Sequence, residues 1–246
     1  MLFLVTVFII SLIRYNKRLY LHLQEKQLMQ LQFNETLLQS QIEIQEETFK
    51  SISQEIHDNI GQELSFVKLN LNSIVENLNA ETKEVVVESK ELVSKSIQQL
   101  RDIARSLNTD YLNDIGLPEA INQQLKLMEK SGRFKTQLVV NGEFVKIEPK
   151  KRLVLFRSIQ ELLSNIINHS AANFVQIALT YQGEILKVEV SDNGKGFDVE
   201  KIMAVDRKGI GLTNVINRIN LINGTISIKS QPGEGTRTII ELNKSF

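Results

Sequence analysis

A histidine, an aspartate and a glutamine lie close together in a segment whose apolar residues have helical spacing. His57 and Asp58 are adjacent, and Gln62 lies one helical turn beyond Asp58. On a helical wheel His57 falls on the shoulder of the apolar stripe, so its ring can face water. A neutral imidazole can attack phosphorus when a carboxylate such as Asp58 accepts its other ring N–H. Gly61, one turn below His57, removes side-chain bulk where another domain would have to approach.

Two considerations leave a second interpretation of this pair open. Consecutive residues on an α-helix do not face each other, so Asp58 would have to reach around the helix to His57. A histidine next to an aspartate is also commonly a solvated surface pair. The nucleophile therefore depends on evidence for a phosphate-bearing ligand elsewhere in the chain.

Two glycine-containing segments supply such evidence. The first follows a strand pattern and contains Asp192, Gly194 and Gly196; its glycines let the backbone turn beside a ligand, and the aspartate can accept a hydrogen bond from an amine. The second, Gly209 to Asn214, opens a helix whose free N–H groups and positive dipole end can face phosphates. The connection 198–208 between them is predicted to be short, mobile and suited to a lid.

A polar stripe on a predicted helix offers oxygen ligands. Glu161, Asn165 and His169 recur every fourth residue along the helix expected from Lys151 to His169, opposite its apolar side. An oxygen-rich stripe suits Mg²⁺ held jointly with phosphate oxygens, since that ion needs few protein ligands. A solvent-exposed polar face would show the same pattern, and the stripe by itself does not separate the two.

The composition limits the classes of protein that can carry these residues. The chain has 246 residues, with 29 Lys and Arg against 29 Asp and Glu, so no global basic field exists to hold nucleic acid. It contains no Cys, which excludes disulfide scaffolds, thiolate zinc sites and a cysteine nucleophile. Hydrophobic residues make up 42% of the chain, enough for a core in one large or two modest domains.

The N-terminal part predicts a membrane helix followed by a coiled coil. Leu2 to Ile13 is apolar and ends in a basic cluster, but twelve helical residues reach only about 18 Å of a hydrocarbon core about 30 Å thick. We interpret it as the inner portion of a membrane helix, with a buried amphipathic start as the alternative. Heptad spacing from Leu21 to Ile56, with polar layers at Glu35 and Gln45, favours a parallel dimeric coiled coil.

A helical hairpin is predicted next. The stripe from Ile56 to Leu78 breaks at Asn77 to Thr82, and a second helix is expected over Lys83 to Leu107. Such a hairpin cannot bury its stripe alone, so two copies should form a four-helix bundle. Residues 108–117 are expected to be a boundary, with Pro118 opening a short helix that ends near Lys130.

After Gly132 the apolar period changes to two, which predicts strands. Thr136 to Val140 and the Asn141-Gly142 turn favour a strand that enters a hairpin. Further strands and a helix at 212–222 are expected, the strands lying at 175–180, 185–191, 225–230 and 236–242. Strands segregated with helices in this way predict an α+β two-layer sandwich.

These motifs together resemble the two-component sensor histidine kinases, in the subfamily with a short His-Asp phosphoacceptor motif that includes nitrate-sensing and lipid-fluidity-sensing kinases. The resemblance covers residue 47 to the end, and the connecting segment Asp114 to Leu117 is similar as well. The matching segments are the H-D-x-x-x-Q motif at His57 to Gln62, the N box at Glu161 to His169, glycine boxes at Asp192 to Gly196 and Gly209 to Leu212, and the G-x-G-T turn at Gly233 to Thr236.

The resemblance implies a role for each matching residue. His57 would be phosphorylated from ATP with Asp58 as general base or orienter, and Gln62 would position water to dephosphorylate a partner. Asn165 would bind Mg²⁺ with support from Glu161. The remaining nucleotide contacts would be His169, Asp192, Gly194, Gly196, Gly209, Gly211, Leu212 and Thr236, with Asp192 and Thr236 at the adenine. The family often has a lysine before His169 to contact phosphate, whereas this chain has Asn168.

The resemblance also implies an organisation and partners. The expected divisions are a membrane helix at 1–13, a coiled-coil linker at 14–46, a dimerisation and histidine phosphotransfer domain at 47–112, and an ATPase domain at 113–246. The expected partners are a second copy, a response regulator receiver domain and the cytoplasmic membrane, crossed once with the catalytic part in the cytoplasm; no direct nucleic acid binding is expected. The alternative is an ATPase or nucleotide-binding membrane scaffold of the same fold without phosphotransfer.

Overall fold

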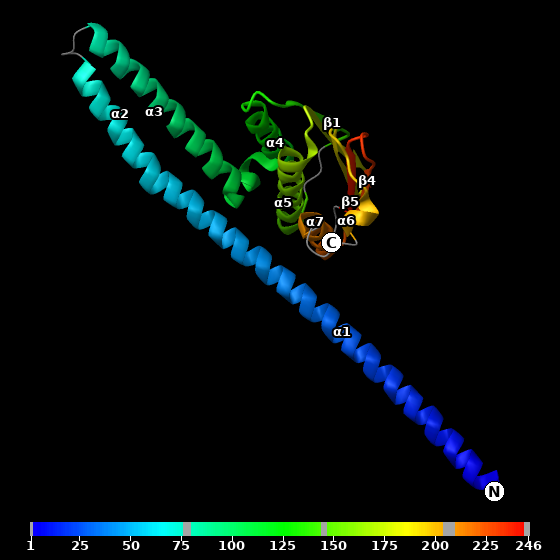
Figure 1. Cartoon of the computed structure of the whole chain (residues 1–246). Coiled ribbons are helices and arrows are strands. Elements are labelled where there is room, and N and C mark those ends of the chain that lie inside the picture. The colour runs from blue at the N-terminus through cyan, green and yellow to red at the C-terminus, as the bar shows by residue number, and fades with distance from the viewer. Residues whose placement is uncertain (1, 76–79, 144–146, 204–209, 244–246) are drawn as a thin grey trace. The chain divides into compact units, whose positions relative to one another are not determined.

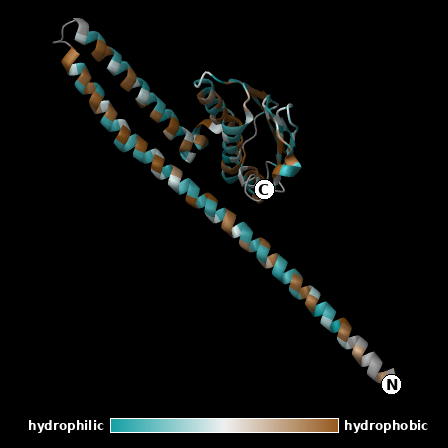
Figure 2. Cartoon of the chain, viewed as in Figure 1, coloured by the Kyte–Doolittle hydropathy of each residue, from teal (hydrophilic) through white to brown (hydrophobic). Residues whose placement is uncertain are grey.

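The computed structural model describes residues 2–75, 80–143, 147–203 and 210–243 (Figure 1). The chain divides into two compact units, Met1–Gln45 and Glu46–Phe246. The first unit is a single helical stretch, which belongs to α1 (Leu2–Glu55). Hydrophobic and hydrophilic residues are interspersed along it (Figure 2). Several large apolar side chains are exposed, among them Leu19, Leu23, Leu28 and Leu31.

The sequence predicts a membrane helix at Leu2 to Ile13. Within the part of the chain that the structure describes, no helix combines the length and the hydropathy needed to cross a bilayer. The prediction of a membrane helix is therefore not supported.

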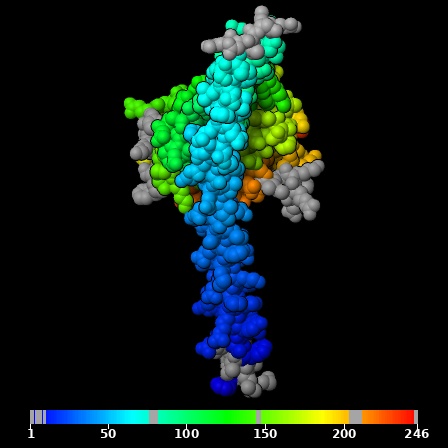
Figure 3. Space-filling view, turned by 90° about the vertical axis from the view of Figure 1, so that its left-hand side faces the viewer, coloured from blue at the N-terminus to red at the C-terminus, as the bar shows by residue number. Residues whose placement is uncertain are grey.

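The second unit begins with a helical hairpin, as predicted. The C-terminal part of α1 continues into a π-helix, η1 (Ile56–Ile60), and then into α2 (Gly61–Val75). The chain returns as α3 (Ala80–Leu107), which packs along α2. Of the break predicted at Asn77 to Thr82, 77–79 lie outside the described residues, and 80–82 already belong to α3. One face of α2 is not covered by other described parts of the chain (Figure 3). Exposed apolar side chains of α2 include Phe66, Leu69 and Ile74.

A kinked helix leads out of the hairpin. Helix α4 (Thr109–Glu129) starts at Asn108, whose side chain accepts hydrogen bonds from the backbone N–H groups of the next turn. Gly116 interrupts it with φ 77° and ψ 165°, and Pro118 follows. Most of the expected boundary segment 108–117 is therefore helical, because the Asn108 cap starts a helix before the kink at Gly116. The helix predicted after Pro118 is confirmed.

A five-stranded sheet forms the rest of the unit. Its strands are β1 (Lys135–Asn141), β2 (Phe174–Gln182), β3 (Ile185–Asp192), β4 (Thr225–Ser230) and β5 (Thr236–Asn243), in the order β1-β2-β3-β5-β4. The intervening helices are α5 (Pro149–Asn165), the π-helix η2 (Ile166–Ser170), α6 (Val199–Met203) and α7 (Ile210–Leu221). Helices α4, α5 and α7 lie on one side of the sheet (Figure 1), which gives the two layers that the sequence predicts.

The core lies between this sheet and its helices. Alternate residues of β2 and β3 point inward and are buried, as period two requires. The fully buried side chains facing each other across the layers include Leu155, Ile159, Val175, Ile177, Leu179, Leu186, Val188, Val215, Ile219 and Ile240. This core fixes α5 against the end of β3, which is where the predicted ligand residues lie.

The predicted hairpin at Asn141-Gly142 is wrong. Strand β1 pairs in parallel with β2, and α5 carries the chain across between them. Gly142 has φ 85°, and a Cβ there would lie 2.2 Å from the carbonyl oxygen of Tyr181. The glycine therefore serves a close approach to the end of β2, whereas the sequence pattern suggests a two-residue turn.

Candidate functional site

His57 lies in the π-helix η1, where the helix turn is wider than in α1 and α2. Gly61 closes this turn by donating its backbone N–H to the carbonyl of Ile56, and a Cβ at position 61 would lie 3.1 Å from that oxygen. The sequence predicts that the absence of a side chain at Gly61 leaves room for another domain to approach. The structure adds a local reason for this glycine, namely the crowded closure of the π-turn.

The His57 ring and the Asp58 carboxylate are in contact. His57 Nδ1 lies 2.9 Å from Asp58 Oδ1, and the two side chains are 75% and 65% exposed. A carboxylate at Nδ1 favours the tautomer with the proton on Nδ1, which leaves a lone pair on Nε2. The expected difficulty that Asp58 must reach around the helix is overcome in the structure. The arrangement provides an exposed, oriented imidazole that can act as a nucleophile.

A cleft of about 750 Å³ adjoins this pair. Its walls come from η1 and α2 on one side and from α3 and the start of α4 on the other, and they include His57, Asp58, Gly61, Gln62, Arg101, Arg105 and Tyr111. Gln62 is exposed and shares the cleft with His57, as the one-turn spacing predicts. The three residues of the motif are therefore brought together.

A second cavity of about 670 Å³ lies between α5, the end of β3 and the start of α7. Eight of the predicted nucleotide residues line it: Glu161, Asn165, His169, Asp192, Gly196, Gly211, Leu212 and Thr236. Gly194 lies next to it, and Gly209 lies outside the described residues. The cavity thus gathers residues that are up to 75 positions apart in the sequence.

The helix that carries the polar stripe differs from the prediction at its end. The sequence predicts one helix as far as His169. In the structure the α-helix α5 ends at Asn165, and the π-helix η2 follows it. Ala171, after η2, has a left-handed backbone conformation with φ 55°. The Ser170 hydroxyl donates to the carbonyl of Ile166, and the Ser170 carbonyl accepts the backbone N–H of Lys195. This wider turn moves His169 off the straight stripe, yet the residue still lines the cavity.

Asp192 stands at the end of β3 and is only 9% exposed. Its Oδ1 accepts the backbone N–H of Gly194 at 2.8 Å, and Thr236 is its cross-strand neighbour on β5. Burial raises the pKa of the Asp192 carboxyl above its ordinary value, while the hydrogen bonds from Gly194 and Thr236 act in the opposite direction. A buried carboxyl held in this way is suited to recognising an amine or amidine edge.

The glycines around Asp192 permit contacts between backbones. A Cβ at Gly194 would lie 2.3 Å from the carbonyl oxygen of Ser170, and one at Gly196 would lie 1.9 Å from that of Gln231. At Gly235 a Cβ would lie 2.1 Å from the carbonyl oxygen of Asp192. The sequence predicts that Gly194 and Gly196 let the backbone turn beside a ligand, and in the structure both glycines also let neighbouring loops pack closely.

The polar end of the cavity is formed by α5 and the N-terminus of α7. A Cβ on Gly211 would lie 2.7 Å from Glu161 Oε1 and 3.3 Å from the amide atoms of Asn165, so both side chains lie beside the start of α7. Asn165 Nδ2 is buried and lacks a hydrogen-bond partner among the described residues. An unpaired buried amide is costly, so its position fits a polar ligand such as a phosphate oxygen.

The cavity also has an apolar lining, which sequence reasoning did not assign to a ligand site. It includes Leu162, Ile166, Val190, Phe197 and Ile202. Flat apolar surfaces beside a buried carboxyl suit a heteroaromatic ring. The period-two pattern places Val190 on the same face of β3 as Asp192, so this part of the wall had a signal in the sequence. Ile202 lies on α6, within the connection predicted to be mobile, and part of that connection is thus helical.

Comparisons with known proteins agree with the two sites. Residues 50–112 match the histidine kinase family, and residues 150–245 match the family of histidine kinase-, DNA gyrase B- and HSP90-like ATPases. The first segment contains the His57 cleft and the second contains the nucleotide-type cavity. The chain therefore carries a segment similar to the histidine kinase family followed by a segment similar to the histidine kinase-type ATPases, which is the domain pair expected from the sequence.

Two relatives share most of the chain. The oxygen sensor histidine kinase NreB of Staphylococcus carnosus is 29% identical over 213 residues, which cover 85% of this chain and 60% of NreB. The signal transduction histidine-protein kinase/phosphatase DegS of Bacillus subtilis is 29% identical over 219 residues, 83% of this chain and 55% of DegS. The chain therefore spans less than two thirds of either relative.

Among solved structures, the histidine kinase domain from the Erythrobacter litoralis EL346 blue-light activated histidine kinase superposes with a TM-score of 0.47 and 14% identity. The superposition covers 74% of this chain and 94% of that domain.

Proposed function

We propose that the chain is an ATP-dependent protein-histidine kinase that phosphorylates His57 and passes the phosphoryl group to a response regulator. The observation that carries this proposal is the exposed His57 ring, held by Asp58 at 2.9 Å, in a chain that also has a cavity suited to a nucleotide. The matched families and the relatives NreB and DegS support it.

In the nucleotide cavity, each wall would hold one part of ATP. Asp192 would accept a hydrogen bond from the adenine amine, with Thr236 beside it and the base against the apolar wall. The N-terminus of α7 at Gly211 and Leu212, with Asn165 Nδ2, would donate to the phosphates. His169 lines the same cavity and would lie near the phosphates.

Glu161 and Asn165 are the residues that would hold Mg²⁺. When bound, the ion would neutralise charge on the phosphate oxygens during transfer. Among the described residues, no group of three or more His, Asp or Glu side chains could hold a metal ion. One or two protein oxygens suffice when phosphates and water complete the shell of Mg²⁺, so the pair fits this role.

In the transfer step, His57 Nε2 would form a bond to the γ-phosphorus while the bond from that phosphorus to the β–γ bridging oxygen breaks. ADP leaves with the electron pair of the broken bond. The Nδ1 proton stays on the ring, and the Asp58 carboxylate stabilises the positive charge that develops there. The phosphoryl group would then pass from Nε2 to a carboxylate oxygen of a receiver domain, which restores the neutral imidazole.

The organisation of the whole protein belongs to the same proposal. We infer a phosphotransfer domain at 47–112 and an ATPase domain at 113–246, which meet within the first part of α4. The exposed apolar residues of α2 support pairing with the hairpin of a second copy into a four-helix bundle. The exposed apolar residues of the first unit support a coiled coil over 14–46.

The proposal is tested by incubating the purified chain with Mg²⁺ and ATP labelled at the γ-phosphate. We expect covalent label that is lost in acid and retained in base, as a nitrogen–phosphorus bond requires, and that moves to a receiver domain on its addition. Nucleotide hydrolysis without label would favour an ATPase of this fold. Binding of ATP without hydrolysis and without covalent label would favour a nucleotide-binding scaffold. Each of these two results would contradict the proposed kinase activity.

The shared cleft predicts a separate role for Gln62. We expect Gln62→Ala to slow the dephosphorylation of a phosphorylated receiver about tenfold, because the side chain that orients the attacking water beside His57 is lost. Autophosphorylation of His57 should stay within about twofold of the wild type, since that step requires no water. The measurement is the loss of label from the receiver in the presence of the kinase and ADP.

Gln98→Ala is the matched control, since Gln98 is an exposed glutamine on α3 outside the residues that line the cleft. An equal loss of dephosphorylation in both variants would contradict the role of Gln62.

A further inference from the structure

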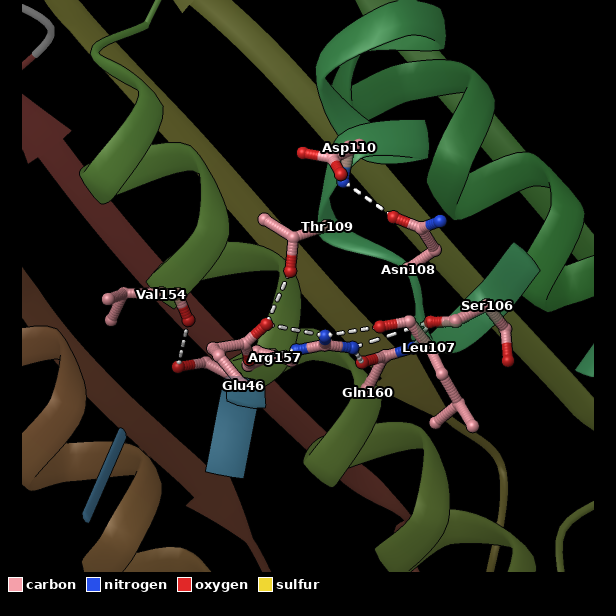
Figure 4. Close-up of polar contacts among 10 residues, drawn as sticks. Glu46, Ser106, Leu107, Asn108, Thr109, Asp110, Val154, Arg157 and Gln160 are labelled. Atoms are coloured by element: carbon pink, nitrogen blue, oxygen red, sulfur yellow. Dashed lines mark hydrogen bonds and ion pairs between the residues drawn. The ribbon is translucent and has the colours of Figure 1, made fainter. Parts of the chain in front are cut away.

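Arg157 on α5 joins three parts of the second unit (Figure 4). Its Nε lies 2.5 Å from Glu46 Oε1, and its Nη2 donates to Glu46 Oε2 at 2.8 Å, which forms a two-pronged ion pair with α1. The same guanidinium donates to the carbonyls of Ser106 at 3.3 Å and Leu107 at 2.9 Å. These carbonyls end α3, where a cation is also favoured by the helix dipole.

The Arg157 guanidinium is buried among protein groups, and Glu46 is largely shielded from solvent. The Arg157 side chain is 5% exposed and that of Glu46 is 16% exposed. The guanidinium carbon lies 4.6 Å from the centre of the Phe49 ring, and Gln160 accepts a further hydrogen bond from Nη1. Thr109 donates its hydroxyl to Glu46 Oε2 at 2.5 Å. The hydrogen-bonding groups of this buried ion pair have partners, and the pair requires a specific geometry. Removal of one of the two side chains would leave the charge of the other uncompensated.

The position of the cluster relates it to both functional sites. Arg157 lies on α5, one turn before Glu161, and Glu161 lines the nucleotide cavity. Glu46 lies eleven residues before His57 on the same continuous helical run, about 16 Å along the axis. Among the described residues, none lines both the nucleotide cavity and the His57 cleft. The cluster thus holds α5 at a place where His57 does not reach its own nucleotide cavity.

We propose that the Glu46–Arg157 pair, with the Ser106 and Leu107 carbonyls, is a latch that restrains phosphoryl transfer to His57. While it is closed, the ATPase domain stays on the end of α3 and on α1. A change in α1 that withdraws Glu46 would release α5 and let the nucleotide approach His57. This inference rests on the proposed kinase function.

The test compares initial rates of His57 labelling at saturating ATP in the full chain. Glu46→Gln keeps the side-chain shape and removes the charge, so we expect labelling to be at least about fivefold faster, as for coupled sites generally. The dissociation constant for ATP should not change, since Glu46 does not line the nucleotide cavity. Unchanged ATP binding with a faster rate separates the latch from a general loosening of the fold.

The matched control is Glu47→Gln, the same charge change on the neighbouring, exposed residue, which should leave the rate within about twofold. If Glu46→Gln does not fold, Thr109→Val removes a single contact to Glu46 and should raise the rate in the same direction. A rate in Glu46→Gln, or failing that in Thr109→Val, that equals or falls below the wild-type rate would overturn the latch. Absence of label in the wild-type chain would instead overturn the proposed function.

Discussion

Replacing His57 with glutamine is expected to abolish the incorporation of phosphate from ATP. Glutamine has similar length and polarity but no ring nitrogen that could form the bond to phosphorus. The His57 side chain is 75% exposed and makes few packing contacts, so the melting temperature should change only slightly, as for other surface substitutions. ATP should bind with unchanged affinity, because His57 does not line the nucleotide cavity. The measurements are acid-labile label and nucleotide binding on the same preparation.

His22→Gln is the matched control, since His22 is an exposed histidine on α1, the helix that continues into η1, and also lies near a carboxylate, Glu25. It should keep full labelling. Label that persists in His57→Gln, or that disappears equally in His22→Gln, would contradict the assignment of the nucleophile.

Replacing Asp192 with asparagine is expected to weaken ATP binding about thirtyfold, or about 2 kcal/mol, which is typical of a lost hydrogen bond to a charged group. Asparagine can still accept the Gly194 N–H through its carbonyl oxygen, so the loop should keep its shape. The substitution should therefore weaken the hydrogen bond to ATP without changing the structure of the loop. The loss of affinity can be measured by titration with ATP and, as a second ligand, with a nucleotide whose base lacks the exocyclic amine, which should lose little affinity.

The same variant should not lose stability. Because burial raises the pKa of Asp192, the native state holds the proton more tightly than the unfolded state does. Stability from this group is fully present below the ordinary pKa and falls as the pH rises through the raised value. At neutral pH Asp192→Asn removes this cost, so its melting temperature should equal or exceed that of the wild type. Glu189→Gln on the same strand, paired with the partly exposed Arg237, is the control for ATP binding.

Local patterns in the sequence were sufficient for the five strands and for most of the long helices, whereas the gathering of the ligand residues was implied by the family resemblance. Period two placed the strands, and the four-residue spacing placed Glu161 and Asn165 correctly because α5 is regular as far as Asn165. The Asn141-Gly142 pair led to a wrong prediction of a hairpin turn. A glycine with positive φ is equally suited to a tight turn and to a close contact with a distant strand, and the sequence does not distinguish the two. The pairing of β1 with β2 depends on the α5 crossover, which a local pattern does not contain.

The π-helices and the latch lay beyond sequence reasoning for different reasons. A π-turn adds one residue to a helix without changing its composition, so nothing in the sequence at His57 or His169 marks it. Glu46 and Arg157 are 111 positions apart, and each alone is an ordinary charged residue on a helix. Only the folded chain shows that they share one buried space.

The separation of the two cavities has a consequence for inhibition. Since none of the described residues lines both, a compound that competes with the nucleotide and another that plugs the groove beside His57 can occupy one molecule at the same time. A substitution in the lining of one cavity would then leave the lining of the other unchanged, and with it the binding of the second compound.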